Sequence, residues 1–242
     1  MNKIFFITAS YLFFLLMNPV ASVAVDYGSF FKQVQGAMGG SSGVSQGEAV
    51  DGLKEALEIG TGNTVQALSR VGGYYDNPKV KIPLPGGVQK FEKILRATGF
   101  GSQVDEFELS MNRAAEKAAP KAKALFVDAI KQMTFSDAKK ILGGPDNAAT
   151  SYFQDKTRGR LQQLFKPIVH HSMEKVGVTQ SYKAVADEIN TIPLAGNYLV
   201  DLDSYVTDKS IDGLFIRLAE EEAKIRNDPA ARVTDLLKKV FK

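Results

Sequence analysis

The two histidines, His170 and His171, are the side chains best suited to bind a metal ion, because the chain contains no cysteine. They are adjacent, and neighbouring residues of a helix point about 100° apart, so both cannot readily ligate one ion. Glu174 lies one helical turn away and adds at most a second ligand from the same face. Zinc sites use three or four ligands. We therefore expect surface histidines and neither a metal nor another cofactor.

Asp201 and Asp203 are spaced like the first two ligands of a calcium-binding loop. Such a loop needs a glycine at its sixth position and a glutamate at its twelfth. Val206 and Asp212 occupy those positions. N-capping of the following helix by Asp203 or Ser204 explains the pattern more simply than calcium binding does.

Three consecutive glutamates, residues 220–222, form an acidic run that Lys224 and Arg226 follow at once. Such mixed charge is typical of a helix face in contact with solvent. Glu222 is in register with the apolar stripe of this helix, so we expect its side chain to be partly buried and paired.

Asn112 and Arg113 lie on one predicted helix and Asp128 lies on the next, within an otherwise apolar run. A buried carboxylate needs a cation or several hydrogen-bond donors, and Arg113 is a natural partner if the two helices form a hairpin. The pattern has two interpretations. One is an interhelical Arg–Asp pair, and the other is the polar floor of a small cleft that binds an anionic or polar ligand. Asn112, Arg113 and Asp128 are therefore our candidate ligand-binding residues.

The sequence shows no recognisable catalytic constellation. There is no Gly-x-Ser-x-Gly elbow for a serine nucleophile, and the glycine clusters lack the Gly-Lys-Ser/Thr of a phosphate-binding loop. A hydrolase that uses carboxylates such as Glu108, Glu116 or Asp128 is one alternative function. A lipid or hydrophobe carrier is another, because 15 phenylalanines permit an apolar cavity, although the same side chains fill an ordinary core.

The first 24 residues have the plan of a secretory signal peptide. Lys3 precedes an apolar run from Ile4 to Met17, and small residues at Ser22 and Ala24 flank a cleavage point. A membrane span needs about 20 apolar residues, which this run does not reach. We expect cleavage after Ala24 and a periplasmic protein with no later transmembrane span. Cleavage removes one lysine and lowers the net charge from +3 to +2, which is too weak to indicate a nucleic acid partner.

Residues 25–45 are rich in glycine and serine, as is typical of a flexible lead-in. Residues 46–242 are predicted to form one all-α domain of about eight to ten helices with short connections. The first helix is expected to bend or break near Gly60 and Gly62. Pro120 is expected to open a new helix, and Thr134 to begin another through a capping box with Asp137.

One connection has a different pattern. Val80, Ile82 and Leu84 alternate with Lys79, Lys81 and Pro83, and further prolines flank the run. Alternation favours an extended backbone, whereas prolines remove donors from a strand ladder. We predict a proline-containing strap that lies on the helical core, with a short edge strand as the alternative.

Several of these stretches together resemble one exported bacterial family, which is catalogued as domain of unknown function 4197. The stretches are residues 77–85, 109–116, 125–130, 203–215 and 235–241. The resemblance covers roughly residues 45–242. It implies a single-domain envelope protein of Gram-negative-type bacteria with no established activity, and it transfers no catalytic residues to this chain.

The function that we expect from the sequence is binding without catalysis. The partner would be a small molecule or another protein of the envelope. An extended proline-containing segment is suited to recognition because little conformational entropy is lost when it binds.

Overall fold

The computed structural model describes residues 46–175, Tyr182, Asp187 and residues 200–227. Its elements are α2 (Gln46–Ser69), α3 (Gly86–Ala97), α4 (Gly101–Ala118), the 3-10 turn η1 (Ala119–Lys121), α5 (Ala122–Lys131), α6 (Phe135–Leu142), α7 (Ala148–Lys175) and α9 (Leu202–Asn227). No residue of this part is in a strand. The described region is therefore all-helical, as the sequence predicts.

Four other predictions lie outside the described residues. They concern the signal peptide at 1–24, the lead-in at 25–45, and two helices that the expected total of eight to ten includes. The pattern predicts these two helices over residues 178–190, of which only Tyr182 and Asp187 are described, and from Thr234 onward.

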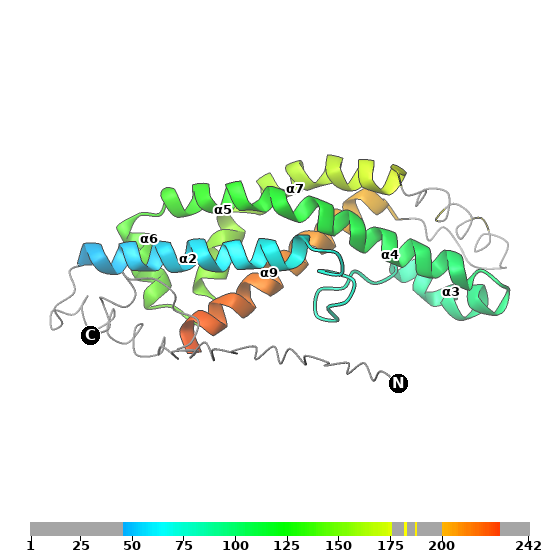
Figure 1. Ribbon diagram of the computed structural model, residues 1–242, viewed down its shortest axis with the longest axis horizontal. Coiled ribbons are helices and arrows are strands. Elements are labelled where there is room, and N and C mark those ends of the chain that lie inside the picture. The colour runs from blue at the N-terminus through cyan, green and yellow to red at the C-terminus, as the bar shows by residue number, and fades with distance from the viewer. Residues whose placement is uncertain (1–45, 176–181, 183–186, 188–199, 228–242) are drawn as a thin grey trace, which may run out of the picture.

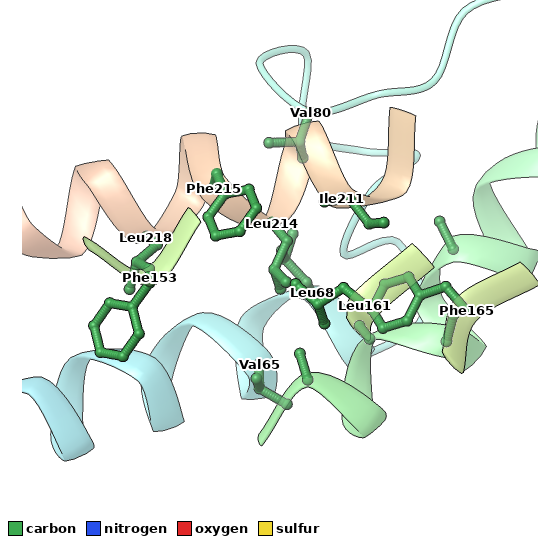
Figure 2. Close-up of a cluster of buried hydrophobic side chains, with 14 of the residues drawn as sticks. Val65, Leu68, Val80, Phe153, Leu161, Phe165, Ile211, Leu214, Phe215 and Leu218 are labelled. Carbon is green, nitrogen blue, oxygen red and sulfur yellow. The ribbon is translucent and has the colours of Figure 1, made fainter. Parts of the chain in front are cut away.

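The long helices run side by side in an elongated bundle (Figure 1), with α3 beside α4 near one end. The core forms where α9 packs against both α7 and α2. Figure 2 shows this core, to which α2 contributes Val65 and Leu68, α7 contributes Phe153, Leu161 and Phe165, and α9 contributes Ile211, Leu214, Phe215 and Leu218. Phe126 of α5 closes it with ring contacts to Phe153 and Phe215 at centroid distances of 5.2 and 6.4 Å. Burial of these apolar faces is the main driving force for the fold.

The expected interruption of the first helix is wrong, since α2 is continuous from Gln46 to Ser69. Gly60 has a different role in this helix. A Cβ atom there would lie 2.9 Å from Cδ1 of Ile225 on α9. The glycine therefore permits close approach of two helices, at the known cost of a flexible residue within a helix.

Pro120 lies in η1, at the start of a new helical segment as predicted. The chain direction does not reverse there, because Ala118, Ala119, Lys121 and Ala122 all keep right-handed helical backbone angles. A first-turn proline needs no donor, so it changes the hydrogen bonding without breaking the path. As a result α5 continues the line of α4 (Figure 1), and the expected hairpin does not form.

The two predicted helix caps have different outcomes. Thr134 forms the expected capping box with Asp137 at the start of α6. At α9 the cap is Asp201, whose carboxylate accepts hydrogen bonds from the backbone N–H of Ser204 at 3.1 Å and from its hydroxyl at 2.7 Å. These bonds lower the pKa of Asp201. The prediction of Asp203 or Ser204 as the cap is wrong, and the Asp203 carboxylate is instead paired with a histidine of α7.

Candidate functional site

Asn112, the first candidate ligand-binding residue, is fully buried and holds the segment between α2 and α3. Its side-chain oxygen accepts a hydrogen bond from the backbone N–H of Ile82 at 2.8 Å. Its side-chain nitrogen donates to the carbonyl of Ile82 at 2.9 Å and to that of Glu108 at 2.8 Å. The amide thus pairs with both backbone groups of Ile82, as a neighbouring β-strand would. Its hydrogen-bonding groups already have partners within the protein.

The same segment buries Val80, Ile82 and Leu84, as the alternation implies. Its outward side chains also have partners. Lys79 pairs with Glu220 at 2.7 Å, and Lys81 pairs with Glu108 at 2.7 Å. This network uses both the side chains and the backbone of the segment to attach it to α4 and α9.

Arg113, the second candidate, pairs with Glu116 of its own helix at 2.6 Å. The Glu116 carboxylate is buried and also accepts hydrogen bonds from the backbone N–H groups of Tyr74 at 3.2 Å and Tyr75 at 3.4 Å. Asp128, the third candidate, has a 47% exposed side chain whose carboxylate lies 3.8 Å from Arg160 of α7. The expected Arg113–Asp128 pair is therefore wrong, because it required the hairpin that α4 and α5 do not form. Binding of a ligand by Asn112, Arg113 and Asp128 stays a prediction.

Tyr74 is the last member of a group of buried polar contacts that we call the Tyr74 cluster (Tyr74, Ile82, Asn112, Glu116 and Ser210). The Tyr74 hydroxyl donates to the carbonyl of Ser210 on α9 at 2.7 Å. Burial, together with the nearby negative charge of Glu116, raises the pKa of Tyr74 above its ordinary value. The ring fits only because α9 has a glycine opposite it, where a Cβ of residue 213 would lie 2.8 Å from the ring.

The acidic run of α9 is only partly exposed, and the expectation of a solvated face is wrong for Glu221. Glu221 is buried and pairs with Arg217 at 2.6 Å. Glu222 is buried and paired as predicted, with Arg226 at 2.9 Å. Its carboxylate also accepts hydrogen bonds from the N–H groups of Ala149 at 2.9 Å and Thr150 at 2.8 Å. A negative charge there stabilises the N-terminus of α7.

A shallow, open cleft of about 630 Å³ lies along α7, beside Asp203 in the first turn of α9. Its lining side chains include two amides, one ammonium group, an imidazole and a carboxylate, and they are Gln162, Gln163, Lys166, Pro167, His170 and Asp203. Two further clefts, each of about 490 Å³, lie between α6 and α7 and between α2 and α9. None of the three candidate residues from the sequence lines these clefts.

The cleft follows a series of polar pairs that we call the α7–α9 seam. Every fourth residue of α7 contacts an acid or hydroxyl of the antiparallel α9. The pairs are Arg158 with Asp212 at 2.7 Å, Gln162 with Asp208 at 3.0 Å, Lys166 with Ser204 at 2.9 Å, and His170 with Asp203 at 2.7 Å. Residues four apart share one helix face. The spacing of the four α7 residues was visible in the sequence, but the helix that they would face was not.

His170 is 54% exposed and lies between two carboxylates. Its Nδ1 is 2.7 Å from Asp203 and its Nε2 is 3.3 Å from Glu174 of the next turn. Both nitrogens can donate to these carboxylates only when both are protonated. The two contacts orient the ring at the end of the cleft.

Pro167 also lines the cleft and removes one hydrogen bond from the helix beside it. It stands within α7, and proline has no N–H to donate to the carbonyl four residues earlier. That carbonyl belongs to Gln163, whose exposed side chain also lines the cleft. The carbonyl of Gln163 therefore lacks its regular helical donor, and the side-chain amides of Gln162 and Gln163 line the cleft.

The described residues contain neither a metal-binding cluster nor a membrane-spanning helix. No group of three or more His, Asp or Glu side chains is arranged to hold a metal ion in this part of the chain. Within the same residues, no helix combines the length and the apolar composition needed to cross a bilayer.

Comparison with known proteins identifies the family. The chain belongs to the family described as "Protein of unknown function (DUF4197)", whose model matches residues 43–242. No curated protein and no solved structure matches the chain.

Proposed function

We propose that this protein is an exported, non-catalytic binding module of the bacterial envelope, and that it holds a polypeptide segment of an envelope partner in the cleft between α7 and α9. The observation that carries the proposal is the chemistry of the cleft lining. The amides of Gln162 and Gln163 line the cleft together with Lys166 and Asp203.

A polypeptide backbone matches this lining because it presents N–H donors and C=O acceptors at regular spacing. Side-chain amides can pair with both groups of one peptide unit, as Asn112 does with Ile82 elsewhere in this protein. The aliphatic stem of Lys166 and the ring of Pro167 add apolar surface between the polar groups. A small anion would use only the cation, and a lipid chain would leave the amide of Gln163 without a partner.

The carboxylates considered for hydrolysis support a non-catalytic role. A general acid or base needs a carboxylate within reach of a substrate in a cleft. Glu108 is paired with Lys81, and Glu116 is buried under two backbone N–H groups and Arg113. Neither residue lines one of the three clefts described above.

A lipid carrier would need an apolar cavity within the bundle. The large core side chains instead contact one another across α5, α7 and α9. Charged side chains line each of the three clefts.

Photo-cross-linking in the source bacterium tests the cleft. A photoreactive residue replaces Gln163, and a matched variant carries it at Gln89, an exposed glutamine of α3. We expect one discrete protein adduct from position 163 and none from position 89. Equal adducts from both positions, or none from position 163, would contradict the assignment.

Export has its own test. The composition of residues 1–24 supports a signal peptide cleaved after Ala24. Mass analysis of the protein purified from its own cell envelope should then show Val25 as the first residue. A chain that keeps residues 1–24 would count against export by cleavage.

A further inference from the structure

The stretch from the end of α4 to α6 carries an excess of positive charge. Residues 117–140 contain six lysines and two aspartates, although the whole chain has a net charge of only +3. The lysines are Lys117, Lys121, Lys123, Lys131, Lys139 and Lys140. The first four lie along the straight segment formed by the end of α4, η1 and α5 (Figure 1).

Burial fixes which way these four lysines point. The apolar residues between them are buried, namely Ala118, Ala119, Ala122, Leu125, Phe126, Ala129 and Ile130. Lys117, Lys121, Lys123 and Lys131 are all exposed. Small alanines bring this segment close to the bundle, so the four ammonium groups lie on the outer side of the segment from the end of α4 to the end of α5. We call this set of four side chains the lysine face.

The charges of the lysine face are not neutralised within the described part of the chain. None of the four lysines has a carboxylate there within ion-pairing distance, and Asp128, the acid on the same segment, is directed to Arg160. The cations of α7 differ, because Arg158 and Lys166 pair with acids of α9. Carboxylates therefore neutralise the cations of the seam, whereas the cations of the lysine face are not neutralised within the described residues.

We propose that the lysine face docks on an anionic lipid surface. All four cations are lysines, which act as point charges and suit diffuse contact with phosphate groups better than bidentate recognition of one partner. The face extends about 20 Å along the helix axis, from Lys117 to Lys131, and so spans several lipid headgroups. No lysine of this face lines any of the three clefts described above, so the shape fits an extended surface rather than a small anion. This proposal uses a different surface from the peptide cleft and does not depend on it.

Vesicle co-sedimentation tests the proposal with the chain that lacks residues 1–24. Vesicles of phosphatidylglycerol and phosphatidylethanolamine should bind the protein, and vesicles of phosphatidylcholine alone should not. Binding should weaken as salt rises above about 0.1 M, where the Debye length is about 10 Å. Each lysine near an anionic surface strengthens binding by about fivefold, so the double variant Lys117→Gln, Lys121→Gln should bind about 25-fold more weakly.

The matched control is a second double variant that loses the same two positive charges at positions outside the lysine face. Lys93→Gln on α3 with Lys209→Gln on α9 removes two exposed lysines and should change binding by less than about twofold. Circular dichroism should show unchanged melting for both double variants, because all four positions are exposed. The proposal would be overturned by equal loss in the two double variants, by equal binding to neutral vesicles, or by stronger binding to duplex DNA or an acidic protein than to the anionic vesicles.

Discussion

The Tyr74 cluster and the α7–α9 seam both consist of amides, carboxylates and hydroxyls that link distant parts of the chain, but they differ in exposure. In the Tyr74 cluster, Asn112 and Ser210 are fully buried and Glu116 almost so, and the hydrogen-bonding groups are used within the protein. In the seam, Lys166 and His170 are about half exposed, and they border an open cleft.

The difference shows which polar groups can serve function. A buried polar group is costly when its partner is lost, so its substitution mainly affects folding. A half-exposed pair adds little stability, because water competes for both partners and screens their charges. We therefore assign the Tyr74 cluster to the fold and the seam to binding, and the following predictions test that division.

The largest effect is expected for Asn112→Ala in the Tyr74 cluster. The substitution leaves the N–H and C=O of Ile82 buried without partners, which should lower the free energy of unfolding by about 2–4 kcal/mol. Urea denaturation of the chain without residues 1–24 measures this change. Asn63→Ala is the matched control, because Asn63 is exposed and makes one 3.3 Å hydrogen bond to Glu221. Equal losses in the two variants would contradict the assignment of Asn112 to the fold.

Gly213→Ala comes next and tests how closely Tyr74 packs on α9. The added methyl group would lie 2.8 Å from the Tyr74 ring and 3.2 Å from Cβ of Val80, which should lower stability by about 1–3 kcal/mol. Gly159→Ala is the control. Gly159 lies within α7 with nothing near its Cβ position, so the substitution should raise the free energy of unfolding by about 0.5–1 kcal/mol. Thermal unfolding of both variants should therefore shift in opposite directions.

The pH dependence of stability tests the burial of Tyr74. Because burial raises the pKa of Tyr74 in the folded state, its contribution to stability is complete below the unfolded pKa of about 10. It is lost as pH rises above that value, by about 1.4 kcal/mol per pH unit for one group. Urea midpoints of wild type and Tyr74→Phe should converge between about pH 9 and pH 11. Parallel curves would show that the Tyr74 hydroxyl is accessible to solvent.

The smallest effect on stability is expected in the seam. Lys166→Ala removes the contacts to Ser204 and Asp201 at 2.9 and 3.4 Å. The free energy of unfolding should nevertheless change by less than about 0.5 kcal/mol, because Lys166 and Asp201 are both half exposed. Cross-linking from position 163 should decrease strongly in the same variant. A large loss of stability would show instead that the seam holds the fold.

Local patterns in the sequence predicted the helical class and one of the two helix caps. The capping box at Thr134 and the helical segment that begins at Pro120 depend only on residues a few positions apart. Glu222 was also predicted correctly as buried and paired, because it interrupts an apolar stripe in register. Such features are determined within one turn of helix, where sequence spacing reports directly on geometry.

Contacts between helices were harder to predict. The first helix was expected to bend or break near Gly60 and Gly62, but α2 does not break, and the role of Gly60 is set by Ile225, which is distant in sequence. The prediction of an Arg113–Asp128 pair was wrong because the two side chains can meet only if the chain reverses direction at Pro120. The chain continues straight there, so α4 and α5 do not face each other. The seam was missed for the same reason, since the spacing of Arg158, Gln162, Lys166 and His170 shows a common face but does not name its neighbour.

Native mass spectrometry tests the central assignment most directly. Wild type and the double variant Gln163→Ala, Lys166→Ala are purified from the envelope of the source bacterium, and urea midpoints confirm equal stability. We predict that wild type carries a polypeptide adduct that dissociates on denaturation and that the double variant does not. An adduct of equal abundance on the double variant, or a bare wild-type protein, would contradict the assignment of binding to the α7–α9 cleft.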